Sequence, residues 1–306
     1  MARTSDGGST VLGAQWRDSG WRASLFPLIE GPTEVVTTPD GRVLAFCRWG
    51  APDGAPLFLL HGTPGSRLLR HVGDGYHRNG LCVYTYDRPG YGLSTRQPGR
   101  RVVDAAVDVR AIAEAVGVDV FGIVGVSGGA AAALGCAALL RGQVTRCATV
   151  VGAAPINAEG LDFAAGMSDE SRRDWTLGLQ GVDALEEEWL HIVEWIVGGL
   201  PGLELRDPER AMLVAAFGEA TRQGSGGFVD DSLALVRDWG FAVDAVRAPT
   251  RVMMARADGI PGAHGDWLVR RLANAELLWV DGGHFGPRDE PEMDLMTWVG
   301  HGGPNP

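Results

Sequence analysis

A serine stands between small residues at 125–129, where the sequence reads Gly-Val-Ser-Gly-Gly. It follows the apolar run 120–126, which predicts a buried strand, and it precedes the alanine-rich run 130–140, which predicts a helix. A tight strand-to-helix turn has no room for bulk on either side of the serine, which explains Gly125 and Gly129. The chain has 45 glycines, so the pentapeptide alone is weak evidence. With partners downstream, it predicts that Ser127 Oγ is held above a sheet as a nucleophile.

A serine hydroxyl needs a base to take its proton and an acid to orient that base. Among the seven histidines, His284 is the best placed base, because it lies in a glycine-flanked loop after the last predicted strand. Asp258 is the candidate acid, because it lies just beyond the penultimate predicted strand. Asp266 and Asp281 lie near these segments, but we expect their side chains to face elsewhere. Glu159 and Asp162, which follow the sixth strand, stay open as alternatives for the acid.

Acyl transfer also needs hydrogen-bond donors for the negative charge that develops on the substrate oxygen. We expect one donor to be the backbone N–H of Gly128, directly after the serine, and the other to be the N–H of Thr63. Thr63 lies in the loop 61–65, His-Gly-Thr-Pro-Gly, which follows a short apolar strand. Each such donor is typically worth ~3 kcal/mol to a transition state. We interpret His61 as a residue that stabilises this loop and not as a base.

Strands and helices alternate along most of the chain, which predicts an α/β fold with a mostly parallel sheet and helices on both faces. A Pro-Asp-Gly turn at 39–41 joins the first two strands into an antiparallel hairpin. The predicted strands are 33–38, 43–49, 57–60, 81–86, 120–126, 145–151, 250–255 and 276–280. The predicted helices outside the cap described below are 67–78, 104–116, 130–140, 264–273 and 293–299.

From about residue 156 to 239 helical segments follow one another without strands, which predicts a helical cap inserted after the sixth strand. The tryptophans in this segment are mostly expected in the core of the cap. The expected division is an N-terminal extension at 1–30, the first part of the core at 31–155, the cap at 156–240, the second part of the core at 241–300, and a tail at 301–306.

The composition excludes several classes of function. A net charge of -11 and a pI near 5.1 disfavour nucleic acid or an anionic membrane surface as partner. All 27 basic residues are arginine, so no lysine is present to form a Schiff base, a P-loop or a Ser-Lys pair. No dinucleotide fingerprint and no metal-ligand spacing is found, so we expect no cofactor and no metal. The expected partner is a small-molecule substrate.

The four cysteines lie in apolar segments without close pairs, so we expect buried, reduced thiols. The polar start of the chain does not resemble a signal peptide, so we expect a cytoplasmic protein. The bias toward arginine and alanine suggests a bacterial genome rich in G and C. The oligomeric state is left open, with a homodimer as one possibility.

Taken together, the motifs resemble the α/β-hydrolase fold family, in particular its capped group of proline iminopeptidases, epoxide hydrolases and small-molecule esterases. The matching stretches are 61–65, 87–92 (Asp-Arg-Pro-Gly-Tyr-Gly), 125–129, 257–258 (Ala-Asp) and 283–285 (Gly-His-Phe), in this order. The resemblance implies a nucleophile elbow at Ser127 and a triad of Ser127, Asp258 and His284. One departure is that the segment Asp-Gly-Ile-Pro at 258–261 is one residue shorter than the family usually has after its acid.

These observations favour a serine hydrolase that cleaves an ester, thioester or amide bond of a small apolar substrate through an acyl-enzyme. The serine argues against the capped epoxide hydrolases and dehalogenases, which attack with an aspartate at the elbow. Two alternatives stay open. The same triad also suits acyl transfer, cyclisation, C–C cleavage or lyase chemistry, and a catalytically silent protein would use the pocket to bind a ligand.

Overall fold

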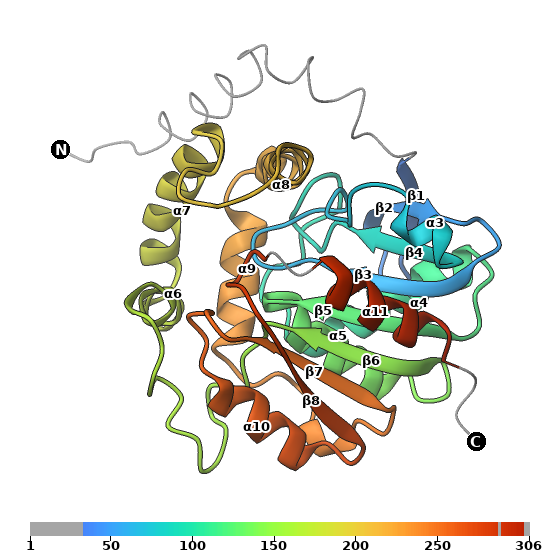
Figure 1. Ribbon diagram of the computed structural model, residues 1–306. Helices are drawn as coiled ribbons and strands as arrows, with labels where there is room; N and C mark the ends of the chain where they lie inside the picture. Colours follow the sequence, from blue (N-terminus) through green and yellow to red (C-terminus); the bar gives the residue numbers. More distant parts are fainter. Residues whose placement is uncertain (1–32, 287–288, 303–306) are drawn as a thin grey trace.

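The computed structural model of the chain describes residues 33–286 and 289–302. Eight strands are present in this part: β1 (Thr33–Thr37), β2 (Val43–Gly50), β3 (Ala55–Leu60), β4 (Leu81–Tyr86), β5 (Phe121–Val126), β6 (Val144–Val150), β7 (Thr250–Ala255) and β8 (Ala275–Val280). They form one sheet in the order β1-β2-β4-β3-β5-β6-β7-β8 (Figure 1). β2 runs antiparallel to β1 and β4, and every other neighbouring pair is parallel. The predicted hairpin and mostly parallel sheet are therefore confirmed.

Both faces of the sheet are covered, and the side chains of β3 show how. Phe58 and Leu60 belong to the apolar cluster on one face, while Leu57 and Leu59 belong to the cluster on the other. A strand buried on both faces reads as a continuous apolar run for this reason. The first cluster includes side chains from α4 (Ala105–Ala115), α5 (Gly128–Leu139) and α10 (Gly262–Arg271), and the second from α3 (Gly75–Arg78) and α11 (Asp289–Gly300).

Four helices between β6 and β7 form the cap: α6 (Asp169–Gln180), α7 (Val182–Val197), α8 (Asp207–Ala220) and α9 (Gly226–Leu235). Figure 1 shows them together at one end of the sheet. The cap contacts the core at this end, because Ser168, just before α6, donates its N–H to the carbonyl of Gly259 after β7 at 3.0 Å. Short 3-10 helices are also present at Val102–Asp104, Thr221–Gln223 and Val243–Ala245. The predicted helical cap after the sixth strand is confirmed.

One predicted helix is mostly wrong. The sequence pattern predicts a helix at 67–78, but only Gly75–Arg78 is helical. The backbone of Arg67 is held by side chains instead, since its N–H donates to Asp87 Oδ1 at 2.7 Å and its carbonyl accepts from the Thr85 hydroxyl. Gly73 has a φ of +88°, which a helix does not contain. The backbone groups that a helix would pair are thus used in fixing the segment to β4.

The cysteines agree with the prediction, whereas the two ends of the chain leave theirs untested. All four cysteines are buried and free. Within the described residues, no helix is long and apolar enough to cross a membrane. The expected N-terminal extension at 1–30 and the end of the tail at 303–306 lie outside the described residues. The boundaries of the domain division stay a prediction.

Candidate active site

Ser127 is the residue between β5 and α5, and its backbone is strained. Its φ is 53° and its ψ is -123°, a backbone conformation that residues other than glycine rarely adopt. Two positions to either side, Gly125 and Gly129 stand where there is no room for a side chain. A Cβ atom on Gly125 would overlap the carbonyl of Gly129, and one on Gly129 would overlap the carbonyls of Leu60 and His61. The turn therefore packs β5, α5 and the loop after β3 together without side chains between them.

Three side chains from three loops form a hydrogen-bonded chain at this turn. Ser127 Oγ lies 2.9 Å from His284 Nε2, and His284 Nδ1 lies 2.9 Å from Asp258 Oδ2 and 3.2 Å from Oδ1. The Asp258 side chain is 1% exposed, and that of His284 is 30% exposed. The N–H of Ile260 also donates to Asp258 Oδ1 at 2.9 Å. The carboxylate is thus fixed as an acceptor for a proton on Nδ1, which leaves Nε2 to accept from the serine.

The other acids weighed from the sequence lie elsewhere. Asp281 is almost fully exposed and pairs with Arg256 at 3.5 Å. Glu159 is also exposed, and its carboxylate pairs with Arg271 of α10 at 3.4 Å. Asp266 and Asp162 are exposed as well. Among these candidates, only Asp258 is within hydrogen-bond distance of His284.

The two expected oxyanion donors belong to segments that touch. A Cβ atom on Gly62 would lie 3.2 Å from Ser127 Cβ, so the loop after β3 passes directly against the serine. The Thr63 hydroxyl occupies the space that a Cβ atom on Gly128 would need. Gly128 is the first residue of α5, where a helix leaves its N–H groups without partners inside the helix. Thr63 and Gly128 are thus neighbours beside Ser127.

Comparison with known proteins agrees with this architecture. A family model described as alpha/beta hydrolase fold matches residues 55–179, which span β3, β4, β5, the Ser127 turn and β6. This chain is an α/β-hydrolase-fold protein. The match begins at the strand that leads into the 61–65 loop and ends within α6 of the cap.

Individual relatives are more distant. A non-heme chloroperoxidase from Streptomyces lividans is 31% identical over 143 residues, which are 42% of this chain and 49% of the relative, so the match spans about half of that protein. Epoxide hydrolase A from Mycobacterium thermoresistibile superposes with a TM-score of 0.67 at 19% identity, covering 90% of this chain and 100% of its own. An esterase from Exiguobacterium antarcticum gives 0.65 at 19%, covering 88% and 99%. At these identities the solved structures are evidence for the fold alone.

His61 is a buried, neutral residue of the loop after β3. Its Nε2 accepts the N–H of Arg88 at 3.3 Å, and its Nδ1 lies 2.7 Å from the Gly62 carbonyl. Burial first, and then the charge of Arg88, lower the pKa of His61 well below its usual range. His61 thus stabilises the loop, as predicted, with both ring nitrogens in hydrogen bonds.

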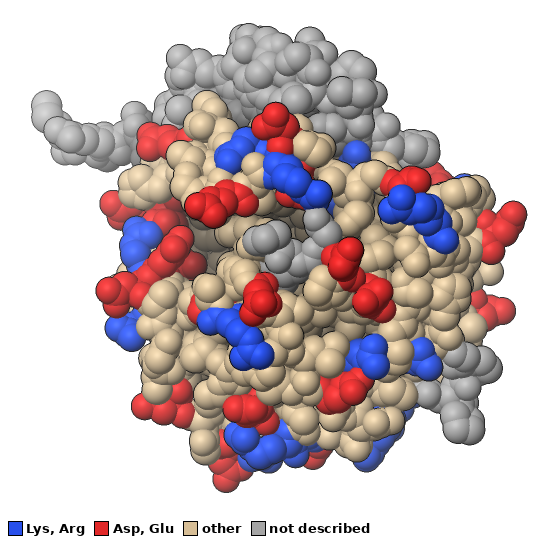
Figure 2. Space-filling model, viewed as in Figure 1, with Lys and Arg blue, Asp and Glu red and all other residues tan. Residues whose placement is uncertain are grey.

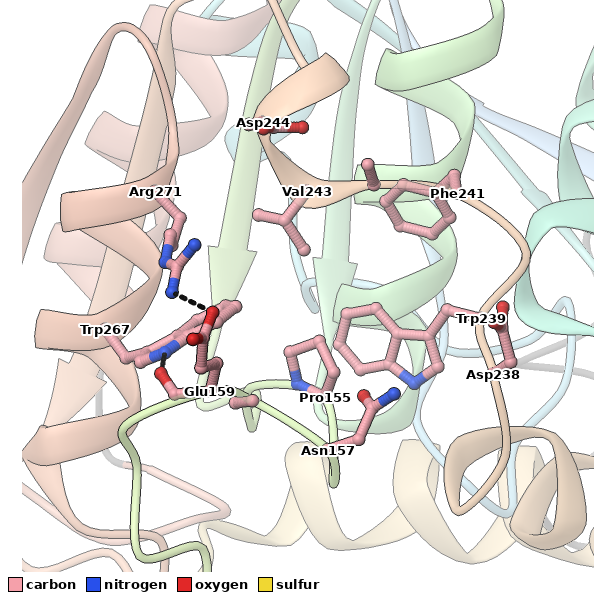
Figure 3. Close-up of a pocket in the computed structure, with 12 residues that line it drawn as sticks. Pro155, Asn157, Glu159, Asp238, Trp239, Phe241, Val243, Asp244, Trp267 and Arg271 are labelled. Atoms are coloured by element: carbon pink, nitrogen blue, oxygen red, sulfur yellow. Dashed lines mark hydrogen bonds and ion pairs between the residues drawn. The ribbon is translucent and has the colours of Figure 1, made fainter.

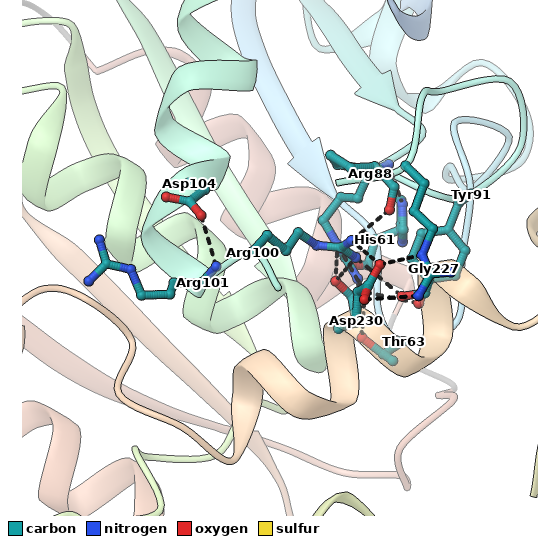
Figure 4. A network of polar contacts seen from close by, with 12 residues as sticks. His61, Thr63, Arg88, Tyr91, Arg100, Arg101, Asp104, Gly227 and Asp230 are labelled. Atoms are coloured by element: carbon teal, nitrogen blue, oxygen red, sulfur yellow. Dashed lines mark hydrogen bonds and ion pairs between the residues drawn. The ribbon is translucent and has the colours of Figure 1, made fainter. Parts of the chain in front are cut away.

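A buried network of charges beside the loop was not predicted (Figure 4). Asp231 of α9 contacts Arg88, Arg100, Tyr91 and Thr63, all from the core. The available signal was a pair of aspartates within the mostly apolar sequence Gly-Gly-Phe-Val-Asp-Asp-Ser-Leu-Ala-Leu of α9. A buried carboxylate requires a cationic partner, and Arg88 of the 87–92 motif was a cation to which no anionic partner had been assigned.

Aromatic side chains connect the histidine loop with the cap. Phe285, next to His284, has its ring centroid 6.1 Å from that of Trp195 in α7 and 6.2 Å from that of Phe217 in α8. Phe285 is 39% exposed, so its ring also faces open space. Figure 2 shows that this side of the molecule is hollowed near the cap, with acidic and basic side chains interspersed around it. An apolar wall thus stands next to the histidine.

A pocket of about 200 Å³ lies away from the serine (Figure 3). Its lining comes from the segments that lead into and out of the cap and from α10, and it includes Trp239, Phe241 and Trp267. Both indole N–H groups are already used, by the carbonyls of Leu235 and Glu159. None of the three residues of the Ser127 chain lines it. Among the described residues, no group of three or more His, Cys, Asp or Glu side chains is arranged to hold a metal.

Proposed function

We propose that this protein is a serine hydrolase that cleaves an ester, thioester or amide bond of a small apolar substrate through an acyl-enzyme. The observation that carries the proposal is the chain of contacts from Ser127 Oγ through His284 to Asp258, with its two shortest links at 2.9 Å. The strained turn at Ser127 supports it, because such strain recurs where a nucleophile must be presented.

In acylation, Ser127 Oγ attacks the substrate carbonyl carbon while its proton passes to His284 Nε2. The carbonyl electron pair moves to oxygen, and the N–H groups of Thr63 and Gly128 donate hydrogen bonds to this negatively charged oxygen. When the carbonyl forms again, the bond to the leaving group breaks and His284 returns the proton to that group. Asp258 remains a carboxylate throughout and holds the imidazole in the required tautomer.

In deacylation, His284 Nε2 takes a proton from water as the water oxygen attacks the acyl carbon. The bond to Ser127 Oγ then breaks, and the serine recovers its proton from His284. The products are a free acid and the unmodified enzyme, so no cofactor is consumed. If another nucleophile displaces water, the same steps give acyl transfer, which keeps the non-hydrolytic alternatives of the sequence analysis open.

The groups around the serine support an apolar substrate. Phe285, Trp195 and Phe217 offer aromatic surface beside the histidine, and the Leu235 side chain of α9 lies over Gly128. Apolar walls favour an apolar acyl group, since each buried methylene contributes ~0.8 kcal/mol to binding.

A second candidate activity comes from the chloroperoxidase relative, at 31% identity over 143 residues. It is favoured by that similarity alone, over about half of the relative's length. Halogenation of a β-diketone in the presence of hydrogen peroxide and chloride or bromide tests it. Turnover there, without turnover of esters, would favour this candidate over the serine hydrolase.

The proposal is tested by labelling with a fluorophosphonate probe, read by intact mass, on the parent, Ser127→Ala and His284→Ala. We expect one adduct on the parent, none on Ser127→Ala and slow labelling of His284→Ala. p-Nitrophenyl esters of increasing chain length then define the acyl group. A well-folded parent that takes no adduct would contradict the proposal and would favour the catalytically silent ligand-binding alternative.

A further inference from the structure

Asp231 is a cap residue that binds to the core and not to the rest of the cap. It lies on α9 and is 7% exposed. Its carboxylate accepts hydrogen bonds from the Thr63 hydroxyl at 3.1 Å, from the Tyr91 hydroxyl at 3.0 Å, and from the guanidinium groups of Arg88 and Arg100. These donors come from two core loops: Thr63 lies in the loop after β3, and the other three donors lie in the connection from β4 to α4. One cap side chain therefore joins two separate core loops.

Arg88 extends this connection to the peptide that holds an expected oxyanion donor. Its guanidinium donates to the carbonyl of His61 and, at 3.0 Å, to the carbonyl of Gly62. The Gly62 carbonyl shares one peptide group with the N–H of Thr63. It also lies 2.7 Å from His61 Nδ1. A carbonyl that accepts two hydrogen bonds polarises its amide, so the N–H at the other end becomes a stronger donor.

The charges in this cluster support the arrangement. Arg88, Arg100 and Arg96 carry three positive charges against the two negative charges of Asp231 and Asp230, and all of these side chains except that of Arg96 are at least nine-tenths buried. Burial raises the pKa of Asp231, but the charges and hydrogen bonds of the two arginines outweigh it and lower that pKa below its usual range. Asp231 is therefore ionised at neutral pH. The net positive charge behind the loop favours an anion in front of it.

The same helix also touches the second donor. Leu235 follows Asp231 by four residues and so lies on the same face of α9. Its Cδ1 atom would be 3.3 Å from a Cβ atom on Gly128, which puts it in contact with the first turn of α5. One face of α9 thus holds the Thr63 loop through Asp231 and packs against Gly128 through Leu235.

We propose that Asp231 is a positioning residue for the oxyanion hole, so that docking of the cap helix α9 sets the Thr63 N–H opposite the Gly128 N–H. This inference rests on the proposed function. The cap then does more than cover the substrate, because the catalytic donors are aligned only while α9 is seated on the core. A cap displaced from Asp231's partners would leave Ser127, His284 and Asp258 in contact but without an aligned oxyanion hole.

The test compares Thr63→Val, Thr63→Ser and Asp231→Asn with the parent. Thr63→Val keeps the size of the side chain and removes the hydroxyl, whereas Thr63→Ser keeps the hydroxyl. The matched control is Glu188→Gln, a mostly buried carboxylate of the cap helix α7, which pairs with Arg173 within the cap and not with the Asp231 cluster. kcat and KM for a p-nitrophenyl ester are measured per active serine, counted by complete fluorophosphonate labelling, so that loss of folded protein does not lower kcat.

Removal of one oxyanion donor typically lowers kcat ~10²–10³-fold, so loss of its positioning should cost less. We expect Thr63→Val and Asp231→Asn to lower kcat by about 10–100-fold with KM changed by less than about two-fold. Thr63→Ser should recover most of the loss, and Glu188→Gln should match the parent. The double variant Thr63→Val/Asp231→Asn should be no slower than Asp231→Asn alone, because both changes break one connection.

Parental kcat in Thr63→Val would overturn the positioning role, as would equal losses in Thr63→Val and Thr63→Ser. If Asp231→Asn does not fold, the two Thr63 variants still decide the question. A parent that takes no fluorophosphonate adduct contradicts the proposed function itself, whereas an active parent with unaffected Thr63 variants contradicts only this inference.

Discussion

The carbonyl of Gly129 occupies the space that a Cβ atom on Gly125 would need. The contact joins the end of β5 to the first turn of α5, directly around Ser127. A side chain at either position would push the helix away from the strand and turn the serine out of its place. The two glycines are thus part of the site although neither carries a functional group.

Gly125→Ala should therefore damage both stability and reactivity. We expect the free energy of unfolding to fall by about 1–3 kcal/mol, as for other overpacked interiors. Fluorophosphonate labelling of Ser127 should slow by roughly 10²-fold, because a shift of about 1 Å has that effect on reacting groups. Urea unfolding and labelling rates measure the two effects.

Gly198→Ala is the control for this change. Gly198 is exposed after α7 and has a right-handed helical backbone (φ -68°, ψ -2°), which alanine adopts without strain. It should leave both quantities near the parental values. A Gly125→Ala variant as stable and as reactive as the parent would show that the turn tolerates a side chain.

On the proposed triad, Asp258→Asn should lower kcat by about 10²–10⁴-fold. The amide cannot hold the imidazole in the tautomer that leaves Nε2 free to accept from Ser127. Asp281→Asn is the matched control, because Asp281 is closer to His284 in sequence but exposed and paired with Arg256. Steady-state rates with p-nitrophenyl acetate distinguish the two. Equal losses in both variants, or none in Asp258→Asn, would remove Asp258 from the acid role.

Local patterns explain why much of the fold was predictable. The apolar run 57–60 and the glycines at 125 and 129 reflect constraints that act within a few residues, namely burial on both faces and lack of space at a turn. In a parallel sheet the loops that follow the strands meet at one edge, so Ser127, Asp258 and His284 could be grouped before their distances were known.

Other features depend on contacts between distant segments. The segment after Arg67 is not helical because Asp87 and Thr85, about 20 residues later, bind its backbone. Thr63 and Asp231 are separated by 168 positions, and their contact exists only because α9 docks on the core. Hydrophobic periodicity carries no information about such a pairing, which is why the Asp231 network was missed.

The neutral state of His61 predicts a dependence of stability on pH. Its pKa in the folded protein lies well below the usual 6.5. As the pH falls below about 6.5, the unfolded chain binds a proton there and the folded chain does not. His61 therefore contributes stability that is present above this pH and lost below it, at about 1.4 kcal/mol per pH unit.

Free energies of unfolding at pH 7.5, 6.5 and 5.5 test this for the parent and His61→Gln. The variant should be less stable overall, but its stability should fall less steeply between pH 6.5 and 5.5. Asp87 and Asp108, whose pKa values burial raises to about 6, act in the opposite direction and are present in both proteins. Parallel curves for the two proteins would mean that the folded state protonates His61.

The contact of Trp195 with Phe285 predicts a preference among acyl chains. The two ring centroids are 6.1 Å apart, and Phe285 follows His284 directly. Trp195→Ala removes part of this wall, so a longer acyl chain should lose more binding than a short one. We expect kcat/KM for p-nitrophenyl hexanoate to fall about 10-fold and that for the acetate to change less than about two-fold.

Trp279→Ala serves as the control, because Trp279 is 41% exposed on β8 and its ring lies near Arg256 instead of Phe285. The Trp195 indole also donates to the Pro201 carbonyl at 3.1 Å, so thermal unfolding should accompany the kinetics. If both esters lose activity equally in Trp195→Ala, the residue supports the cap and does not contact the acyl chain. A selective loss for the hexanoate would place the acyl group between α7 and the histidine loop.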